Sequence, residues 1–214
     1  MWGAKLVPDV ISYSAGISAC EKGTQWQRAL ALLREMREAK LETNVISYNA
    51  GISACGKCMQ WQRALALLSE MCGATLEPNF MSYGAGISAC EKGAQWQRAL
   101  ALLSEIREAK LKPNVMSYSA GISACEKGKH WQRALALLSE MWVAKLVPDV
   151  MSYSAGISAC EKGEQWQRAL ALLSEMREAK LEINSATALR PARVRDAASG
   201  GMRCRCSARC GSAM

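Results

Sequence analysis

Trp26-Gln27-Arg28-Ala29-Leu30-Ala31-Leu32-Leu33 decides the fold, because the same eight residues return at 61–68, 96–103, 131–138 and 166–173. The step is 35 residues each time. Self-similarity at a fixed period of about 20–50 residues is the signature of a repeat architecture. A tyrosine series keeps the same register, at Tyr13, Tyr48, Tyr83, Tyr118 and Tyr153. The sequence therefore predicts five copies of one structural unit.

Each unit is predicted to hold two helices. The first covers about 12–22, where Tyr13, Ile17 and Cys20 form one apolar stripe at helical spacing. Gly23 follows as a stop signal, which we expect to adopt the left-handed conformation that ends many helices. The second helix begins near residue 25 and turns Trp26, Ala29, Leu30, Leu33 and Met36 toward the first.

Stacking is what stabilises such a unit, because neither helix can bury its apolar stripe alone. Five stacked copies share one continuous core, and a small rotation per copy produces a superhelix with a concave face. The expected fold class is all-α, a right-handed superhelical solenoid of helix-turn-helix repeats. The predicted repeats cover 10–44, 45–79, 80–114, 115–149 and 150–184.

The two ends depart from this pattern. Residues 1–10 match residues 141–150 at all but one position, so residues 1–9 are interpreted as the remnant of a truncated repeat. We therefore expect a fragment of a longer array. Residues 185–214 have no helical period and are expected to form a disordered tail rich in Arg and Cys.

Charge and cysteine content say little about chemistry. The net charge is +8, but residues 185–214 carry six Arg and one Asp, a net of +5, which leaves +3 for the rest. The repeats are thus close to balanced and support a nucleic-acid partner only weakly. Half of the ten cysteines recur once per unit inside Gly-Ile-Ser-Ala-Cys, where a small thiol is expected to pack in the core of a protein from a reducing compartment. They are Cys20, Cys55, Cys90, Cys125 and Cys160.

The unit resembles the pentatricopeptide repeat family. The features that carry the resemblance are Val-Ile-Ser-Tyr-Ser-Ala-Gly-Ile-Ser-Ala-Cys-Glu-Lys-Gly from residue 10, the Trp-Gln-Arg-Ala-Leu-Ala-Leu-Leu run, and a closing Pro followed by Asp or Asn. The constant step of 35 residues separates this family from the tetratricopeptide repeats of 34 residues. The resemblance implies binding of single-stranded RNA at about one base per repeat.

It also implies which residues read the bases. In this family the fifth and last residues of a unit contact the base edge, and the second residue packs against base faces. The reading residues would be Ser14 with Asn44, Asn49 with Asn79, Gly84 with Asn114, Ser119 with Asp149, and Ser154 with Asn184. The stacking residues would be Ile11, Ile46, Met81, Met116 and Met151. The family code then predicts adenine, a pyrimidine, an unassigned base, guanine and adenine from 5′ to 3′, because Gly84 has no side chain for reading.

The residues themselves are compatible with this role and with simpler ones. Ile11, Ser14 and Ser18 lie opposite the buried stripe at three- and four-residue steps, where a hydroxyl or amide can donate and accept hydrogen bonds. Ser at a helix start is also a common cap, and Asn before a helix can simply shape a turn. One lysine per repeat could contact phosphate or lie at a solvated helix end: Lys22, Lys57, Lys92, Lys127 and Lys162.

No pattern in the chain predicts catalysis, a metal or a cofactor. The single histidine is His130, and no His-x-Glu with a downstream Cys-x-x-Cys marks a zinc deaminase. Cys55-x-x-Cys58 occurs once without partners, and Cys204, Cys206 and Cys210 in the tail form at best a weak zinc candidate. We therefore expect a protein that is not an enzyme.

Two functions remain open from the sequence. The main hypothesis is a single-stranded RNA binder in RNA processing, stability or translation, with no membrane or small-molecule partner. The alternative is a helical scaffold that binds other proteins. The resemblance implies a mitochondrial or chloroplast protein, although the chain shows no targeting segment.

Overall fold

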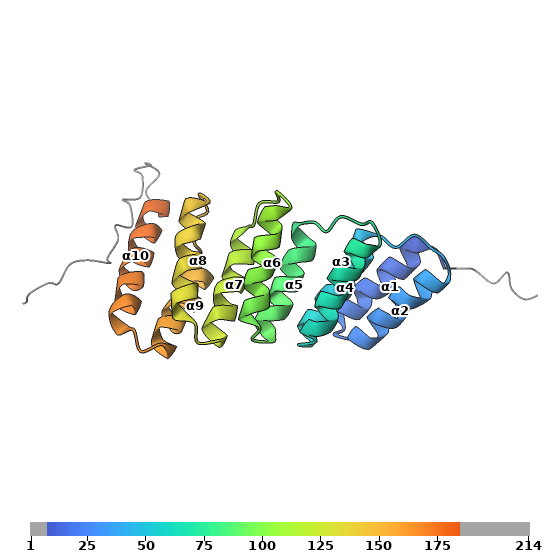
Figure 1. Ribbon diagram of the computed structural model, residues 1–214, viewed down its shortest axis with the longest axis horizontal. Coiled ribbons are helices and arrows are strands. Elements are labelled where there is room, and N and C mark those ends of the chain that lie inside the picture. Colours follow the sequence, from blue (N-terminus) through green and yellow to red (C-terminus); the bar gives the residue numbers. More distant parts are fainter. Residues whose placement is uncertain (1–7, 185–214) are drawn as a thin grey trace, which may run out of the picture. The chain divides into compact units, whose positions relative to one another are not determined.

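The computed structural model describes residues 8–184, and every regular element in this range is an α-helix (Figure 1). Each repeat holds two helices. The first helices are α1 (Val10–Lys22), α3 (Val45–Lys57), α5 (Phe80–Lys92), α7 (Val115–Lys127) and α9 (Val150–Lys162). The second helices are α2 (Trp26–Glu38), α4 (Trp61–Gly73), α6 (Trp96–Glu108), α8 (Trp131–Val143) and α10 (Trp166–Asn184). The predicted all-α repeat solenoid is confirmed.

The first helices begin two residues earlier than the sequence indicated. The side chain of Asp9 accepts a hydrogen bond from the Ser12 backbone N–H at 2.8 Å, so Asp9 is the N-cap and Val10 the first helical residue. Asn or Asp caps every later first helix in the same way. Ser12 is therefore the third residue of its helix and not the first.

The left-handed residue of the turn is not the glycine that we expected. Gly23 has a φ of −82°, and the next residue, Thr24, has a φ of 55°. The position after the glycine is left-handed in every repeat, although none of its residues is glycine: Thr24, Met59, Ala94, Lys129 and Glu164.

The glycine serves close packing instead. A Cβ placed on Gly128 would lie 2.5 Å from Cδ1 of Trp96, in the second helix of the preceding repeat. The indoles of Trp61 and Trp131 lie against Gly93 and Gly163 in the same way. Repeat 2 is the exception, with Cys58 at this position and its thiol 3.2 Å from the carbonyl of Thr24.

The helices form two layers with different spacing. Neighbouring first helices contact one another directly, and α2, α4, α6 and α8 each contact the first helix of their own repeat and that of the next. Within residues 10–162 the backbones of α2, α4, α6 and α8 do not approach each other, and only long side chains cross between them, as in the ion pair of Arg37 with Glu70. Because the first layer is the tighter one, we infer that the first helices line the inner side of the array.

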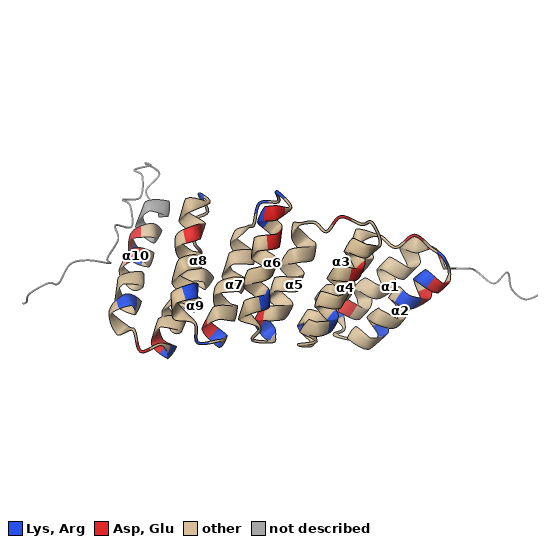
Figure 2. Cartoon of the chain, in the orientation of Figure 1, with Lys and Arg blue, Asp and Glu red and all other residues tan. Residues whose placement is uncertain are grey.

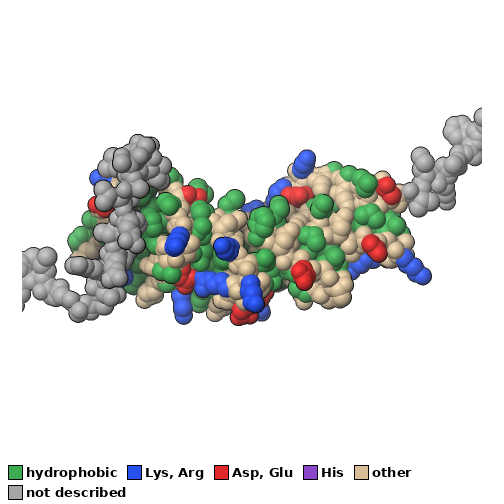
Figure 3. All heavy atoms as spheres, turned by 90° about the horizontal axis from the view of Figure 1, so that it is seen from above, with side chains coloured by type: hydrophobic (Ala, Val, Ile, Leu, Met, Phe, Trp, Pro, Cys, Tyr) green, Lys and Arg blue, Asp and Glu red, His purple; other side chains and the backbone are tan. Residues whose placement is uncertain are grey.

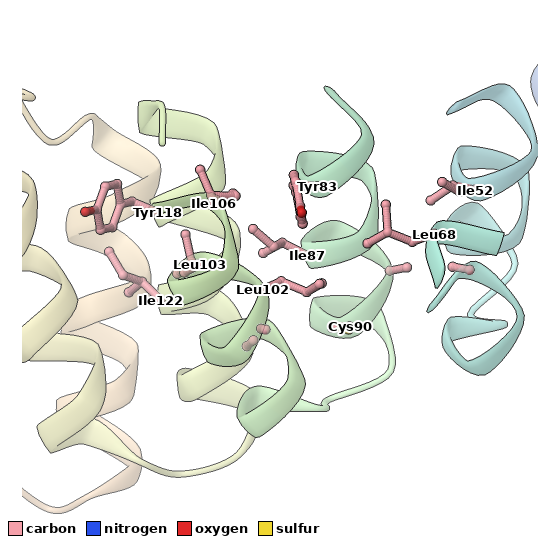
Figure 4. Packing of buried hydrophobic residues seen from close by; sticks show 14 of the residues in the cluster. Ile52, Leu68, Tyr83, Ile87, Cys90, Leu102, Leu103, Ile106, Tyr118 and Ile122 are labelled. Atoms are coloured by element: carbon pink, nitrogen blue, oxygen red, sulfur yellow. The ribbon is translucent and has the colours of Figure 1, made fainter. Parts of the chain in front are cut away.

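Small residues permit the tight layer, and leucines fill the space behind it. A Cβ on Gly56 would lie 3.1 Å from the Cβ of Ala89, so α3 and α5 are close at this point. On α6, Leu102 reaches Gly86 of its own repeat, while Leu103 reaches Gly121 of the next. Figure 4 shows these two leucines among the buried side chains of the neighbouring helices. Each second helix therefore wedges two leucines between successive first helices.

The repeated cysteines belong to this core. Cys55, Cys90, Cys125 and Cys160 are buried, while Cys20 in the first repeat is half-buried. Burial raises the pKa of Cys55, Cys90 and Cys125 to about 11, which keeps these thiols protonated and unreactive. The part of the chain that the structure describes contains no helix long and apolar enough to cross a membrane.

The last helix is longer than its counterparts. α10 continues to Asn184, whereas α2, α4, α6 and α8 each end at the fifth residue after their central leucine pair. A compact unit extends to Glu178, and a separate unit begins at Ala179. The remnant at 1–7 and the tail at 185–214, with Cys204, Cys206 and Cys210, lie outside the described residues.

Candidate nucleic-acid interface

A column of exposed aliphatic side chains follows the first helices. The second residue of each repeat is 58–77% exposed, whereas the serine that follows it is buried in repeats 2 to 5. The column consists of Ile11, Ile46, Met81, Met116 and Met151, the side chains predicted to stack on bases. Hydrophobic side chains also interrupt the polar surface elsewhere along the array (Figure 3). Among the large hydrophobic side chains, only this column is exposed at the same helix position in all five units.

In repeats 1 to 4 the last residue is held in place by its role as a helix cap. Oδ1 of Asn44 accepts the Ser47 backbone N–H at 2.8 Å and the Ser47 hydroxyl at 2.9 Å. Asn114 and Asp149 cap α7 and α9 with the same pair of bonds, to Ser117 and Ser152. The predicted reading residues therefore have a structural function that any binding role must share.

Capping determines which atom is left to bind a ligand. The backbone N–H is a donor, so the oxygen of an Asn cap must face it and the Nδ2 amide group remains free. In Asp149 the remaining atom is Oδ2, which only accepts when the carboxyl is ionised. An Asn cap therefore presents a donor to the surface, and the Asp cap presents an acceptor.

The fifth residue of each repeat lies beside this cap. The Ser119 hydroxyl is 3.3 Å from Oδ1 of Asp149, and Asn49 Nδ2 is 3.5 Å from Oδ1 of Asn79. Ser14 is linked to Asn44 through Ser47, with 2.7 Å between the two hydroxyl oxygens. The structure thus brings together the predicted pairs of repeats 1, 2 and 4.

The other two pairs differ. Gly84 has open space where a side chain would be, since the nearest atom to a Cβ built there is Ser117 Oγ at 3.8 Å. Ser154 is exposed on α9, but its predicted partner Asn184 is the last residue of α10 and caps no described helix. These pairs present one residue each, Asn114 and Ser154.

The third residue of each unit was missing from the predicted site. The buried serines at this position each donate the hydroxyl hydrogen to the oxygen of the cap: Ser47, Ser82, Ser117 and Ser152. The hydroxyls of Ser47 and Ser152 are also in contact with the fifth residue of the preceding repeat, Ser14 and Ser119 respectively. The spacing Asn/Asp-x-x-Ser at every repeat junction is a capping pattern and could have identified these serines.

Three of the five lysines are already paired with carboxylates. Lys57 lies 3.0 Å from Glu21, Lys127 3.0 Å from Glu91, and Lys162 2.7 Å from Glu126, always between neighbouring first helices. Repeat 2 has Gly56 in place of the glutamate, so Lys92 has no carboxylate partner within residues 8–184, and neither has Lys22. Figure 2 shows these charges near the ends of the helices. They lie eight residues, or roughly 12 Å, along the helix from the fifth position.

Other conspicuous side chains join repeats to each other. The ring of His130 lies 3.9 Å from that of Trp96, and the guanidinium of Arg168 lies 4.8 Å from the centre of the Trp131 ring. Arg63 is placed over Trp26 in the same way, at 5.8 Å. No group of three metal-ligating side chains occurs in the described part of the chain.

Solved structures share this fold. The pentatricopeptide repeat domain of Arabidopsis thaliana protein-only RNase P 1, in complex with tRNA, superposes with a TM-score of 0.70 at 15% identity, covering 79% of this chain and 89% of that one. PPR10 from maize with an 18-nucleotide psaJ RNA element gives 0.69 at 24% identity, covering 85% of this chain. Arabidopsis thaliana protein-only RNase P 2 gives 0.69 at 13% identity, covering 79% of this chain and 38% of that one.

The chain spans only 27% of the length of maize PPR10. None of the curated proteins compared with the chain matches it. A family model described as the pentacotripeptide-repeat region of PRORP matches residues 8–190, most of the sequence. Together with the 35-residue helix pairs, this match shows that the chain belongs to the pentatricopeptide repeat family.

Proposed function

We propose that the chain binds single-stranded RNA along the inner side of its first helices, at about one base per repeat. The observation that carries the proposal is the column of five exposed aliphatic side chains beside the capped polar pairs. An apolar side chain next to each hydrogen-bonding pair can support the face of a base while the pair contacts its edge. A base then fits between the aliphatic residues of neighbouring repeats.

The free atoms of the caps give the proposed order of bases a chemical basis. Oδ2 of Asp149 is an acceptor and fits the N–H donors on the pairing edge of guanine. The Nδ2 groups of Asn44 and Asn79 are donors and fit ring nitrogens or carbonyl oxygens, as adenine and pyrimidines present them. Ser14 and Asn49 then separate adenine in repeat 1 from a pyrimidine in repeat 2, and the fifth repeat, with Ser154, takes adenine.

Two relatives support RNA as the partner. PPR10 and protein-only RNase P 1 have each been solved with RNA bound, on the same fold. We propose a role in RNA processing, stability or translation through occupation of the strand, without catalysis by the repeats and with no small-molecule substrate. The alternative, a scaffold for proteins, would use the same exposed column but has no need of the polar pairs found in repeats 1, 2 and 4.

A base-swap experiment tests the proposal. The full chain is titrated with a short RNA of the proposed order, with a scrambled RNA and with the duplex, and we expect the first to bind most tightly. Asp149→Asn keeps the helix cap but replaces the free acceptor with a donor, so the preference at the fourth base should move from guanine to adenine. Asp9→Asn makes the same change at a cap without a described fifth residue before it, and should leave the base preference at the fourth position unchanged.

Equal affinity for all three nucleic acids would exclude base reading and favour the scaffold. A preference for guanine that survives Asp149→Asn would show that this residue does not read the base. The proposed residence in mitochondria or chloroplasts rests on the family alone, and is tested by imaging a fluorescent fusion of the full-length gene product.

A further inference from the structure

An exposed row of arginines follows the second helices, whereas the candidate RNA site follows the first. The third residue of every second helix is an arginine, and all five are exposed: Arg28, Arg63, Arg98, Arg133 and Arg168. Within residues 8–184 none of these guanidinium groups forms an ion pair with a carboxylate. We call this row the arginine ridge.

The ridge lies at the more positive of the two long edges of the array. Because the helices alternate in direction, the turns inside the repeats lie at one edge and the loops between repeats at the other (Figure 1). The five turns, 21–28 and the equivalent residues, contain eleven Lys and Arg and five Glu, a net of +6. The four loops, 34–44 and the equivalent residues, contain seven Lys and Arg and nine Asp and Glu, a net of −2. The array therefore presents opposite charge at its two edges.

Stability of the helices does not explain the ridge. The first turn of a helix is the positive end of its macrodipole, where an acidic side chain is favourable and a cation is not. The second helices have no acidic residue in their first turn and carry the arginine there instead. The same unfavourable placement occurs five times, which points to a use of the arginine outside its own helix.

Packing on tryptophan accounts for only part of the row. The guanidinium of Arg63 lies 5.8 Å from the centre of the Trp26 ring, and that of Arg168 lies 4.8 Å from the centre of the Trp131 ring. A guanidinium stacked on a ring keeps the N–H donors along its edge, in the fork geometry that suits a carboxylate. The other three arginines have no ring partner within the described residues. The ridge therefore has free donors in every repeat.

The tryptophans beside the ridge do not offer a platform for RNA bases. Proteins that bind single strands without reading their sequence combine basic residues with exposed aromatic rings, on which the bases stack. Trp131 is half-buried, with Gly163 in contact with its indole and Arg168 over its ring. Because the ring is already covered, the ridge lacks the stacking surface that a single-stranded RNA requires.

The neighbours of each arginine suit a protein chain instead. An exposed glutamine precedes it in every repeat, as Gln27 precedes Arg28, and an exposed alanine follows three residues later, as Ala31 does. The glutamine amide donates and accepts hydrogen bonds, as a peptide backbone requires, whereas the phosphates of RNA only accept. The alanine is small and lets a partner chain approach the helix.

We propose that the arginine ridge binds an extended acidic segment of a partner protein, with carboxylates of the segment on the guanidinium groups. Neighbouring repeats are packed helix on helix, so successive arginines are roughly 10 Å apart. In an extended polyproline II chain every third side chain points the same way, at intervals of roughly 9 Å. A segment with an acidic residue at every third position, or more often, therefore meets one arginine per repeat. The candidate RNA site on the first helices stays free.

Polyglutamate is the probe for this site. The full chain is titrated with a fluorescent polyglutamate of about 20 residues, long enough to span five repeats at roughly 3 Å per residue. The salt concentration is about 0.1 M, where charges farther apart than roughly 10 Å are screened. Arg28, Arg98 and Arg133 are replaced together by Gln, because they have no ion-pair or ring partner within residues 8–184. We expect about a tenfold loss of affinity, which is what three exposed ion pairs contribute together.

The matched control removes the same charge from the opposite edge. Lys40, Lys110 and Lys145 are exposed, occupy one position in the loops of three repeats, and are replaced together by Gln. The affinity for polyglutamate should then stay within about twofold of the unmodified chain, because these positions lie far from the ridge. Circular dichroism verifies the fold of both triple variants. If the ridge variant fails to fold, Arg98→Gln alone should still weaken binding about twofold.

Two further titrations separate the ridge from the candidate RNA site. Saturation of the chain with the short RNA of the proposed order should leave its affinity for polyglutamate unchanged. Polyuridylate of the same length as the polyglutamate, added to the chain with its first-helix site filled, should bind the ridge variant and the unmodified chain alike. The titrations with polyglutamate alone contain no RNA, so they remain decisive even if the proposed RNA binding fails.

Three outcomes would overturn the proposal. The unmodified chain could fail to bind polyglutamate. The ridge and loop variants could lose equal affinity, which would mean that the probe senses only the total charge of the chain. The ridge variant could lose more affinity for polyuridylate than for polyglutamate, or the short RNA could displace polyglutamate, and either result would assign the ridge to nucleic acid.

Discussion

At the scale of single residues, the repeat assigns two tasks to one side chain. Asn44 caps a helix through Oδ1 and leaves Nδ2 for a ligand, and Asp149 caps a helix through Oδ1 and leaves Oδ2. The exchange of Asn for Asp therefore changes the surface chemistry without removing the cap. In the proposed function, this exchange is what would change the base preference from one repeat to the next while the scaffold hardly varies.

The glycine of the turn is explained by a neighbour and not by its own backbone. Ala at Gly128 would lie 2.5 Å from Trp96, whose ring is also in contact with His130 and cannot move away without losing that contact. We expect Gly128→Ala to lower the free energy of unfolding by about 1–3 kcal/mol, the usual range for an overpacked core. Urea denaturation measures this change.

Gly23→Ala is the matched control, since Gly23 also follows Ala-Cys-Glu-Lys and has a φ of −82°, close to the −78° of Gly128. Its new methyl group meets nothing closer than 3.4 Å, so stability should stay unchanged or rise by about 0.5 kcal/mol through the lower entropy of the unfolded chain. Similar losses in the two variants would show that the indole contact is not the reason for the glycine.

At the scale of helices, the caps are the feature with a measurable contribution. Asn114→Ala removes the acceptor for two hydrogen bonds from Ser117 and leaves that buried hydroxyl without its partner. We expect a loss of about 1–2 kcal/mol in the free energy of unfolding, measured by urea denaturation. Asn114→Asp keeps the acceptor and should retain most of the stability, so an equally large loss in both variants would contradict the capping role.

The helices also show how far the sequence alone could go. Its period gave the number of helix pairs and their apolar faces, because the spacing of Tyr, Trp and Leu depends only on local geometry. The turn was harder to predict, since the reason for Gly128 is an indole 32 residues earlier in the chain. The candidate site was identified only through the family resemblance, and the buried serines behind it through the structure.

Two identical segments show most directly what a local sequence pattern cannot predict. Met-Arg-Glu-Ala-Lys-Leu-Glu occurs at 36–42 and again at 176–182. The first copy leaves the helix after Glu38 and has a φ of 54° at Lys40, whereas the second copy remains helical to Asn184. These seven residues by themselves therefore do not determine where the helix ends.

At the scale of the whole molecule, the distribution of charge predicts how RNA binding depends on salt. If all five repeat lysines met phosphates, the slope of log K against log salt would be about −3.5, at roughly −0.7 for each single-strand phosphate. Lys57, Lys127 and Lys162 already pair with glutamates, which leaves Lys22 and Lys92 in the described residues. We therefore expect a slope of about −1.5 from the repeats.

Releasing the paired lysines should change that slope. With Glu21, Glu91 and Glu126 all replaced by Gln, three ammonium groups become free, so RNA should bind more tightly at low salt and the slope should steepen by about 2. The control replaces Glu38, Glu108 and Glu178 by Gln, which changes the net charge equally on exposed positions of the second helices. Fluorescence anisotropy over a salt series measures both. Because the control adds charge on the outer layer, equal steepening in the two triple variants would mean that RNA senses only the total charge and that the repeat lysines make no specific phosphate contacts.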